Sequence, residues 1–254
     1  MGAVRRRRWA RRGVRLLDDS IFPPRVDPTL TPKTTDYWRA RLSTLGVETY
    51  CGVPMSKLPE DLRVYQHLMW HDGVDTVIEI GTRHGGSALW FRDTLATAAR
   101  YGRILDFRVI TVDIDLELSD SALANVDPEH EGIEILEGDA QDPGLPALVD
   151  ELVPENAHCL VVDDSAHDYE TTLSVLRGFA GFVPDGGFLV IEDGVVDDEE
   201  LRVKSSDWPR GVLPAIRDWL KSAEGLQFEV RREMELYGVT TNLKGFLQRC
   251  QPVK

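Results

Sequence analysis

The sequence predicts an α/β fold in which a doubly wound, mostly parallel sheet is covered by helices on both faces. Three observations predict it. Short runs rich in β-branched residues alternate with stretches of helical periodicity, a glycine-rich turn joins the first such run to a helix, and acidic residues follow several runs. Strand and helix repeated in this order produce parallel strands with helices packed on either side.

The elements follow an N-terminal helical arm along the chain. In order we expect a helix at 37–45, a helix at 59–70, a strand at 76–80, a helix at 86–100, strands at 108–112, 133–137 and 159–163, a helix at 169–183, a strand at 188–192, a helix at 213–221, and strands at 228–234 and 245–249. The helical stretches have the 3.6-residue period of one buried face, and the strands are short β-rich runs.

The start of the chain differs from the rest in composition. The first 17 residues carry arginines at Arg5–Arg8, Arg11, Arg12 and Arg15 and no acid, and residues 18–35 are rich in proline. We expect residues 1–35 to be a basic extension and linker, and 36–254 to be one domain. A basic amphipathic helix that contacts a partner and a loosely docked extension remain alternatives for the arginine-rich part.

Composition and charge exclude several classes of partner. The net charge is −14 over 254 residues, which argues against nucleic acid because phosphate contacts need a basic face. No apolar run of about 18 residues is present, so we expect no membrane partner. Cys51, Cys159 and Cys250 are widely spaced and odd in number. They predict reduced thiols in a cytoplasmic protein.

The segment TVIEIGTRHGGSALWF places a strand, a glycine-rich turn and a helix start in order. Its candidate cofactor-binding residues are Glu79, Gly81, Thr82, Gly85 and Ser87. The spacing E-x-G-x-x-x-G-G departs from the G-x-G-x-x-G of dinucleotide sites, and a carboxylate there would repel pyrophosphate. It suits a cofactor with a positive charge and an amino group, such as S-adenosyl-L-methionine. A tight turn without a ligand remains the alternative.

Acids also follow the second and third strands. Asp113 stands where doubly wound sheets commonly hold the hydroxyls of a ribose, with Asp115 as a weaker candidate. Asp139, Ala140 and Gln141 follow the third strand, where a side chain could bond an adenine amino group. The alternatives are a surface cap for the first acid and ordinary turn residues for the others.

The fourth and fifth strands end in paired acids, Asp163–Asp164 and Glu192–Asp193. Parallel neighbours end at the same edge of the sheet, so these four carboxylates would repel each other unless a cation joined them. Oxygen ligands favour a hard divalent ion, most simply Mg²⁺. Which of the two paired aspartates holds the metal stays open, and Asp163 is a candidate for cofactor contact.

His167 lies one turn beyond Asp164. At that distance it can reach a substrate hydroxyl next to the metal, and a neutral imidazole is the ordinary general base near pH 7. His167 and Asp164 are therefore the candidate catalytic residues. A solvent-facing histidine at a helix start is the alternative.

Five segments together resemble a known family across roughly residues 38–250. They are GVPMSKLPEDLRVYQHLMW, IEIGTRHGGSALWF, VITVDID, VVDDSAHDYETTLSVLRGFAGFVPDGGFLVIED and FEVRREMELYGVTTNLKGFLQR. In this order they resemble the cephalosporin hydroxylase-like family. That family includes rhamnosyl O-methyltransferases and is similar to the Mg²⁺-dependent macrolide-sugar O-methyltransferases.

The resemblance implies a class I S-adenosylmethionine-dependent, Rossmann-like methyltransferase fold of seven strands with the last one antiparallel. It also implies a metal held by Asp164, Glu192 and Asp193. DDSAH is similar to the D-D-G-S-H pattern of the macrolide enzymes, which implies that His167 is the base. The chain departs from members with D-S-D-H by carrying Ala166. A hydroxylase activity is not expected, because the sequence lacks the residue pattern of a two-His, one-carboxylate iron site.

The expected function is therefore O-methylation of a small, glycosylated secondary metabolite of the kind found in antibiotic biosynthesis, with S-adenosyl-L-methionine and Mg²⁺. Lys57, Lys204 and Trp208 are candidates for the acceptor pocket, with a surface or packing role as the alternative. Alternatives are N-methylation, a cofactor-binding accessory protein of a hydroxylase or methylation system, and, weakly, an NAD-dependent dehydrogenase. We expect a small-molecule substrate and a homo-oligomer.

Overall fold

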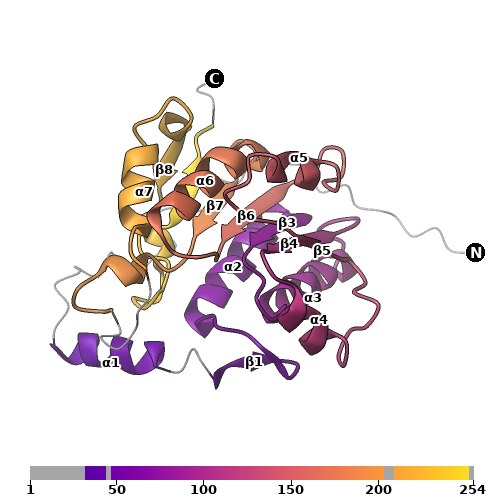
Figure 1. The fold of residues 1–254 in the computed structure, drawn as a ribbon, viewed down its shortest axis with the longest axis horizontal. Coiled ribbons are helices and arrows are strands. Elements are labelled where there is room, and N and C mark those ends of the chain that lie inside the picture. Colours follow the sequence, from indigo (N-terminus) through magenta and orange to yellow (C-terminus); the bar gives the residue numbers. More distant parts are fainter. Residues whose placement is uncertain (1–31, 44–46, 203–208, 252–254) are drawn as a thin grey trace, which may run out of the picture.

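In the computed structural model, residues 32–43, 47–202 and 209–251 are described. One central sheet has helices packed on both faces (Figure 1). The arginine-rich start, Lys204 and Trp208 lie outside the described residues, so the expectations placed on them stay predictions.

The sheet has seven strands, and its topology sets the place of the site. In spatial order they are β5 (Ile133–Glu137), β4 (Arg108–Asp113), β3 (Thr76–Ile80), β6 (Cys159–Asp163), β7 (Phe188–Ile191), β9 (Phe246–Arg249) and β8 (Phe228–Val230). Strands β5 to β7 are parallel, and β9 runs antiparallel to both of its neighbours. The predicted fold class is confirmed. The strand order reverses between β3 and β6, which is where ligands bind in open α/β sheets.

Two hydrophobic cores lie on opposite faces of the sheet. On one face pack α5 (Leu145–Asp150), α6 (Tyr169–Phe179) and α7 (Val212–Trp219), and on the other α2 (Pro59–Asp72), α3 (Gly86–Arg100) and α4 (Glu117–Leu123). Every strand residue of β3, β6 and β7 is buried. Strands buried along their whole length are expected where a parallel sheet is covered on both faces.

The alternation of side chains along each strand decides which face the site acids reach. Val77, Val162 and Val190 belong to the core on the α2 side. Two residues further along, the same alternation brings Glu79, Asp164 and Glu192 to that side. The register supports this, because Glu79 pairs with Val162, and Val162 pairs with Val190. The strand ends therefore carry three acids toward the start of α2.

Short elements depart from the expectations. The helix α1 (Pro32–Leu42) begins within the residues predicted as linker, and β1 (Thr49–Tyr50) and β2 (Val53–Pro54) form an unpredicted hairpin. The helices α4 and α5 were not predicted either. They have seven and six residues, which is too short for helical periodicity to show in the sequence.

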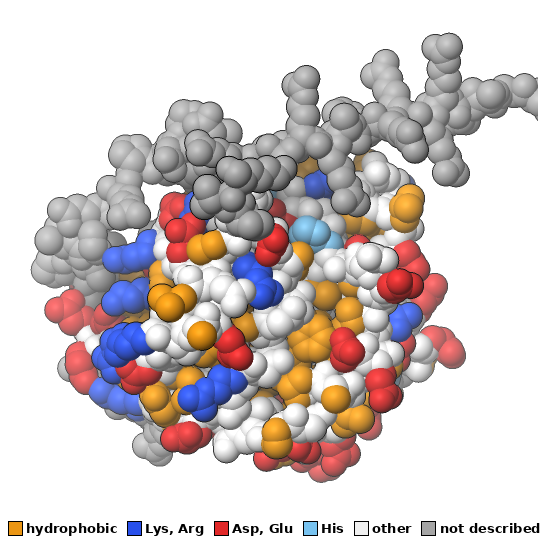
Figure 2. All heavy atoms as spheres, turned by 90° about the horizontal axis from the view of Figure 1, so that it is seen from above, with side chains coloured by type: hydrophobic (Ala, Val, Ile, Leu, Met, Phe, Trp, Pro, Cys, Tyr) orange, Lys and Arg blue, Asp and Glu red, His pale blue; other side chains and the backbone are white. Residues whose placement is uncertain are grey.

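The surface reflects the acidic composition. On the face in Figure 2, acidic side chains lie along much of the rim and basic ones gather along one side. No described helix has the length and apolar character needed to cross a membrane. In the described part of the chain, Cys51, Cys159 and Cys250 are free thiols. The expectation that nucleic acid is not a partner rests on the excess of 43 acidic over 29 basic residues.

Candidate functional site

A cavity of about 710 Å³ opens at the carboxyl ends of the parallel strands. Its size lies within the range of about 300–1,000 Å³ usual for small-molecule sites. The turns after β3, β4, β5 and β6 form its walls, and residues 54–57, just before α2, form one side. Seven of the predicted cofactor-binding residues line it: Gly81, Thr82, Ser87, Asp113, Asp139, Ala140 and Gln141.

Three other predicted cofactor residues, Glu79, Gly85 and Asp163, are not among the residues that line this cavity. Glu79 is fully buried on the α2 side of β3. Its Oε2 accepts a hydrogen bond from the Thr111 hydroxyl at 2.8 Å, and its Oε1 has no hydrogen-bond partner among the described residues. Burial raises the pKa of Glu79. The carboxylate therefore lies behind the cavity wall.

Two glycines of the first turn, Gly81 and Gly85, serve the packing of the protein itself. Gly81 has φ +100°, and a Cβ there would lie 2.1 Å from the backbone oxygen of Asp164. Gly85 has φ +82°, and its Cβ would lie 2.6 Å from the Leu123 side chain. Both positions favour glycine for its positive φ as well as for its size. Gly81 lets the turn after β3 pack directly on the turn after β6.

Gly81→Ala is expected to destabilise the protein and weaken binding in the cavity together. The left-handed conformation and the overlap with the Asp164 carbonyl each cost about 1–3 kcal/mol. Relief of the overlap moves the Asp164 turn. Chemical denaturation and calorimetry with S-adenosylhomocysteine measure the two effects. Unchanged ligand affinity in a destabilised variant would show that the contact between the two turns does not shape the cavity.

Polar groups on the cavity wall are partly engaged by the backbone. The carboxylate of Asp113 accepts a hydrogen bond from the Arg83 N–H at 2.6 Å. Asp139 accepts one from the Gln141 N–H at 2.8 Å. Thr82 lines the cavity, and its buried hydroxyl has no hydrogen-bond partner among the described residues. A buried polar atom without a partner on a cavity wall is a place where a ligand can bond.

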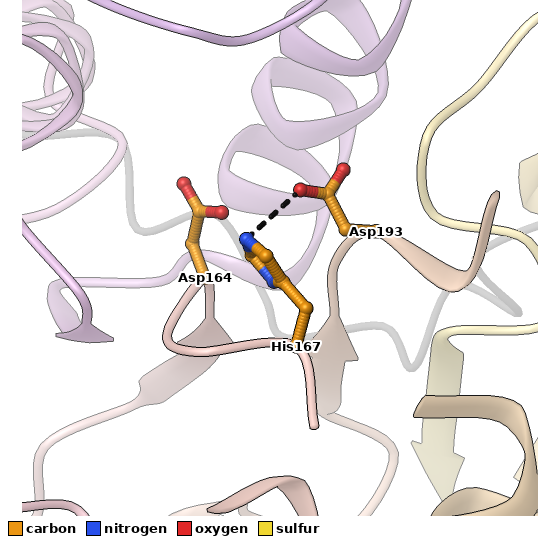
Figure 3. A group of neighbouring side chains, drawn as sticks. All are labelled: Asp164, His167 and Asp193. Carbon is orange, nitrogen blue, oxygen red and sulfur yellow. Dashed lines mark ion pairs between the residues drawn. The ribbon is translucent and has the colours of Figure 1, made fainter. Parts of the chain in front are cut away.

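Beside this cavity, Asp164, His167 and Asp193 come together from two turns. Their candidate ligand atoms all lie within 4.8 Å of one another. Figure 3 shows the imidazole between the two carboxylates, with Asp164 after β6 and Asp193 after β7. His167 Nε2 is 3.2 Å from Asp193 Oδ2. All three residues line the cavity.

Two members of this group have an uncommon backbone conformation. His167 has φ 58° and Asp193 has φ 55°. Histidine and aspartate enter this left-handed region more readily than most residues, but it remains sparsely populated. Such conformations cluster at functional sites, where the surrounding structure holds them. Here they turn both side chains to one point at the edge of the sheet.

Glu192, predicted as a metal ligand, is not one of these three residues and is bound by a buried lysine. Lys57 Nζ is 2.7 Å from Glu192 Oε1 and 2.9 Å from Asp164 Oδ2. The same ammonium lies 3.9 Å from Glu79 Oε1. The Tyr65 hydroxyl also donates a hydrogen bond to Glu192. Glu192 therefore accepts hydrogen bonds from two residues, Lys57, which precedes α2, and Tyr65, which lies in it.

The pKa shifts reflect burial first and these contacts second. Burial alone would lower the pKa of Lys57, but Asp164, Glu192 and Glu79 outweigh it, so its pKa is raised. Burial would likewise lower the pKa of His167, yet Asp193 and the other acids raise it. Burial raises the pKa of the carboxyl groups of Asp164, Glu192 and Asp193.

The two aspartates that follow one another at the end of β6 have different environments. Asp163 points to the opposite side from Asp164, and its carboxylate accepts hydrogen bonds from the hydroxyl and the N–H of Ser165. Burial raises its pKa to about 6. Of the pair, Asp164 is the one that lies in the group with His167 and Asp193.

A buried polar network supports the group from behind. The carboxylate of Asp61 accepts hydrogen bonds from the Thr240 hydroxyl and from the N–H of Thr241 at 2.9 Å. The Asn242 amide lies 3.4 Å from the Tyr65 hydroxyl. These contacts tie α2 to the segment that runs behind the Asp193 turn. They also hold Tyr65 against Glu192.

Sequence reasoning placed Lys57 in an acceptor pocket and gave no role to Tyr65. Lys57 does line the cavity, but its ammonium lies among the acids. Two signals could have indicated these contacts. Lys57 is an isolated lysine in an otherwise uncharged run before α2, and Tyr65 lies on the apolar face of that helix with Val64 and Leu68.

Comparison with known proteins connects this geometry to a family. A family model described as Rhamnosyl O-methyltransferase/CmcI matches residues 45–250. The chain is similar to the rhamnosyl O-methyltransferase of Mycobacterium bovis (strain BCG / Pasteur 1173P2), with 25% identity over 79% of this chain and 78% of that protein. The corresponding enzyme of Mycobacterium leprae (strain TN) is 26% identical over 79% of this chain and 82% of its own.

Solved structures resemble the chain in fold. A structure of CmcI described with Mg and SAM has a TM-score of 0.55 and 23% identity, and the match covers 90% of both chains. The MycE methyltransferase of the mycinamycin biosynthetic pathway, in complex with Mg, SAH and mycinamycin VI, has a TM-score of 0.50 and 16% identity. That match covers 76% of this chain and 48% of the other. At these identities the likeness is one of fold.

Proposed function

The chain belongs to the Rhamnosyl O-methyltransferase/CmcI family, and on that premise we propose how its site works. The family match confirms the predicted family and its O-methyltransferase class. We propose that the chain methylates a hydroxyl of a small, glycosylated secondary metabolite. The methyl donor is S-adenosyl-L-methionine, and a divalent cation, Mg²⁺ in the simplest case, assists.

The cavity fits the donor. Its walls offer Asp113 for a ribose and the backbone and side chains of Asp139–Gln141 for an adenine, with the Gly81 turn between them and the acids. The unpartnered Thr82 hydroxyl is a further point of contact. The CmcI and MycE structures carry SAM or SAH by their descriptions, which is consistent with a donor site in this fold.

The charges beside the cavity fit a cation. Glu79, Asp164, Glu192 and Asp193 are buried or nearly buried carboxylates, and Lys57 supplies one positive charge among them. An excess of negative charge remains, and repulsion of this kind favours a divalent ion. We propose Asp164 and Asp193 as its protein ligands, because their oxygens suit Mg²⁺. Glu192, whose Oε1 accepts hydrogen bonds from Lys57 and Tyr65, stays a predicted further ligand.

The reaction needs an electrophilic methyl group and an acidified hydroxyl. The donor supplies the first, and a divalent ion lowers the pKa of the second. His167 removes the hydroxyl proton at its imidazole, and Asp193, 3.2 Å from Nε2, orients the ring and stabilises the imidazolium that forms. Holding donor and acceptor in line contributes an effective molarity that can reach about 10⁵ M.

One observation carries this proposal: the group of Asp164, His167 and Asp193 opens into the same cavity as the Gly81 turn. The proposed metal ligands, the proposed base and the proposed donor-binding wall therefore all face the same cavity. A site for cofactor binding alone would not need an imidazole oriented by a carboxylate beside that wall.

Methyl transfer from isotopically labelled S-adenosyl-L-methionine to a panel of rhamnosylated and other deoxysugar metabolites tests the proposal. We expect labelled product with Mg²⁺, its loss with EDTA, and its return when Mg²⁺ is restored. Fragmentation mass spectrometry locates the label on oxygen or nitrogen. Transfer that continues in EDTA with the label on nitrogen would favour the N-methylation alternative. A homo-oligomer stays a prediction, which light scattering can check.

A further inference from the structure

We propose that the Lys57 ammonium is a built-in counter-cation that shares Asp164 with the divalent ion. In this role Lys57 limits the affinity of the site for the ion and stabilises the acids in its absence. The inference rests on the cation of the proposed function. It concerns a residue that has no part in the transfer of the methyl group.

The position of Lys57 is built by the fold. The side chain is 2% exposed and enters from the segment between β2 and α2. Its Nζ contacts Glu192 at 2.7 Å and Asp164 at 2.9 Å, and Glu79 lies 3.9 Å away. These acids come from three neighbouring parallel strands, all on the face of the sheet covered by α2. Lys57 thus lies at the centre of the charge that the strand ends bring together.

Asp164 belongs to two groups at once. Its Oδ2 accepts the hydrogen bond from Lys57, and the same residue is one of the three candidate ligands within 4.8 Å of one another. A carboxylate that binds an ammonium gives less negative potential to a second cation. In addition, two cations a few ångström apart in a buried site repel each other by several kcal/mol at an effective dielectric constant of about 20.

Glu192 explains how Lys57 can remain when Asp164 turns to an ion. Lys57 and Tyr65 both donate to Glu192 Oε1, so the ammonium keeps a partner without Asp164. Both of these hydrogen bonds use the same oxygen of Glu192. Glu192 holds Lys57 beside the site, where the positive charge lowers the affinity for the metal.

Without Lys57, the buried carboxylates would lose their partner. Removing one member of a buried ion pair is strongly destabilising, because the remaining charge is left uncompensated. We therefore expect two opposite effects from one substitution. The metal-free protein loses stability, and the divalent ion binds more tightly.

Lys57→Gln tests this, since glutamine removes the charge but can still donate to Glu192. We expect Mg²⁺ and Mn²⁺ to bind about tenfold or more tightly by calorimetry. We also expect a lower melting temperature in EDTA and a larger gain in melting temperature on adding Mg²⁺ than in the wild type. The matched control is Lys221→Gln, which removes the same charge from an exposed pair with Asp218. It should leave the metal affinity unchanged.

The outcomes separate this inference from the proposed function. A wild-type protein that binds no divalent ion overturns the cation of the proposed function together with this inference. A wild type that binds Mg²⁺, with a Lys57→Gln affinity that is equal or weaker, overturns the inference alone.

If the variant does not fold, ¹⁵N NMR of the lysine ammonium groups in the wild-type protein tests the same inference. The signal of Lys57 is identified as the one that is missing from the spectrum of Lys57→Arg. A shift of that signal on adding Mg²⁺ supports the sharing of Asp164, and an unmoved signal in protein that binds Mg²⁺ refutes it.

Discussion

Asp164→Asn is expected to lower cation-dependent methyl transfer by on the order of 10³-fold, the scale seen when a main electrostatic contact at a reacting centre is removed. The amide has the shape of the carboxylate but no charge. Asp164 faces both the cation group and Lys57, so the change removes a ligand and leaves the ammonium with Glu192 as its near partner. Both effects weaken binding of a divalent ion.

Donor affinity should remain nearly intact in this variant, because the Asp164 carboxylate contacts Lys57 and the group of His167 and Asp193. The Asp164 backbone oxygen, which packs against Gly81, is unchanged. Calorimetry with S-adenosylhomocysteine measures that affinity, and initial rates over a range of Mg²⁺ concentrations measure the loss of transfer. A variant that keeps the full rate at every concentration would remove Asp164 from the metal site.

Asp163→Asn is the matched comparison, with the same chemical change one residue away. Asp163 is bound to Ser165 on the opposite face, and asparagine retains an oxygen for those bonds. We expect its rate to stay within about tenfold of the wild type. A larger loss in Asp163→Asn than in Asp164→Asn would exchange the roles of the two aspartates.

Most of the fold could be predicted because its main strands and longer helices each leave a recognisable pattern in one continuous stretch of sequence. The runs at 76–80, 133–137 and 159–163 coincide with β3, β5 and β6. The apolar character of β3 and β6 follows from burial on both faces, whereas β5, at the end of the sheet, is only partly buried. The helix at 86–100 coincides with α3. The short hairpin of β1 and β2 has no comparable signal, because two-residue strands carry no alternation.

The site could be predicted only in part. Acids after neighbouring parallel strands must meet at one edge, and this argument places Asp164 and Asp193 together. It does not say which face each acid takes. The two-residue alternation separates Asp163 from Asp164 and turns Glu192 to the α2 side, and Asp193 reaches His167 only through its left-handed φ of 55°.

Lys57 shows the limit of local reasoning. It is 107 residues from Asp164 and 135 from Glu192 in sequence, and no motif joins them. Only the packing of α2 on the sheet brings the ammonium to the acids. The acids at the strand ends predict a divalent cation between them, and the chain itself also supplies a positive charge there through this lysine.

His167→Asn is expected to reduce transfer by about 10²–10⁴-fold, as for the loss of a general base. Asparagine tolerates the left-handed conformation that His167 adopts with φ 58°, so the turn should persist, but its amide cannot take a proton. Because a base must be unprotonated, the wild-type rate should fall as the pH drops through the pKa of His167. That limb of the pH profile should be absent in the variant.

The direction of the pKa shift makes a further test possible. Burial lowers the pKa of His167, but Asp193, Asp164 and the other acids raise it above its ordinary 6.5. A divalent ion held by Asp164 and Asp193 would neutralise the acids that raise it, so saturating Mg²⁺ should move the acidic limb to lower pH. NMR titration of the imidazole with and without Mg²⁺ measures the same change directly.

Metal affinity separates the two roles that the geometry allows for His167. As a base, His167 can be lost with little effect on Mg²⁺ binding, and only the rate falls. If His167 is a third ligand, within 4.8 Å of the two carboxylates, its loss would weaken metal binding by about an order of magnitude or more, and most for ions that favour imidazole nitrogen, such as Zn²⁺ and Ni²⁺. Calorimetry of His167→Asn with Mg²⁺ and Zn²⁺ therefore decides between the two roles. If His167→Asn kept the full rate but bound the metal more weakly, His167 would be excluded as the base.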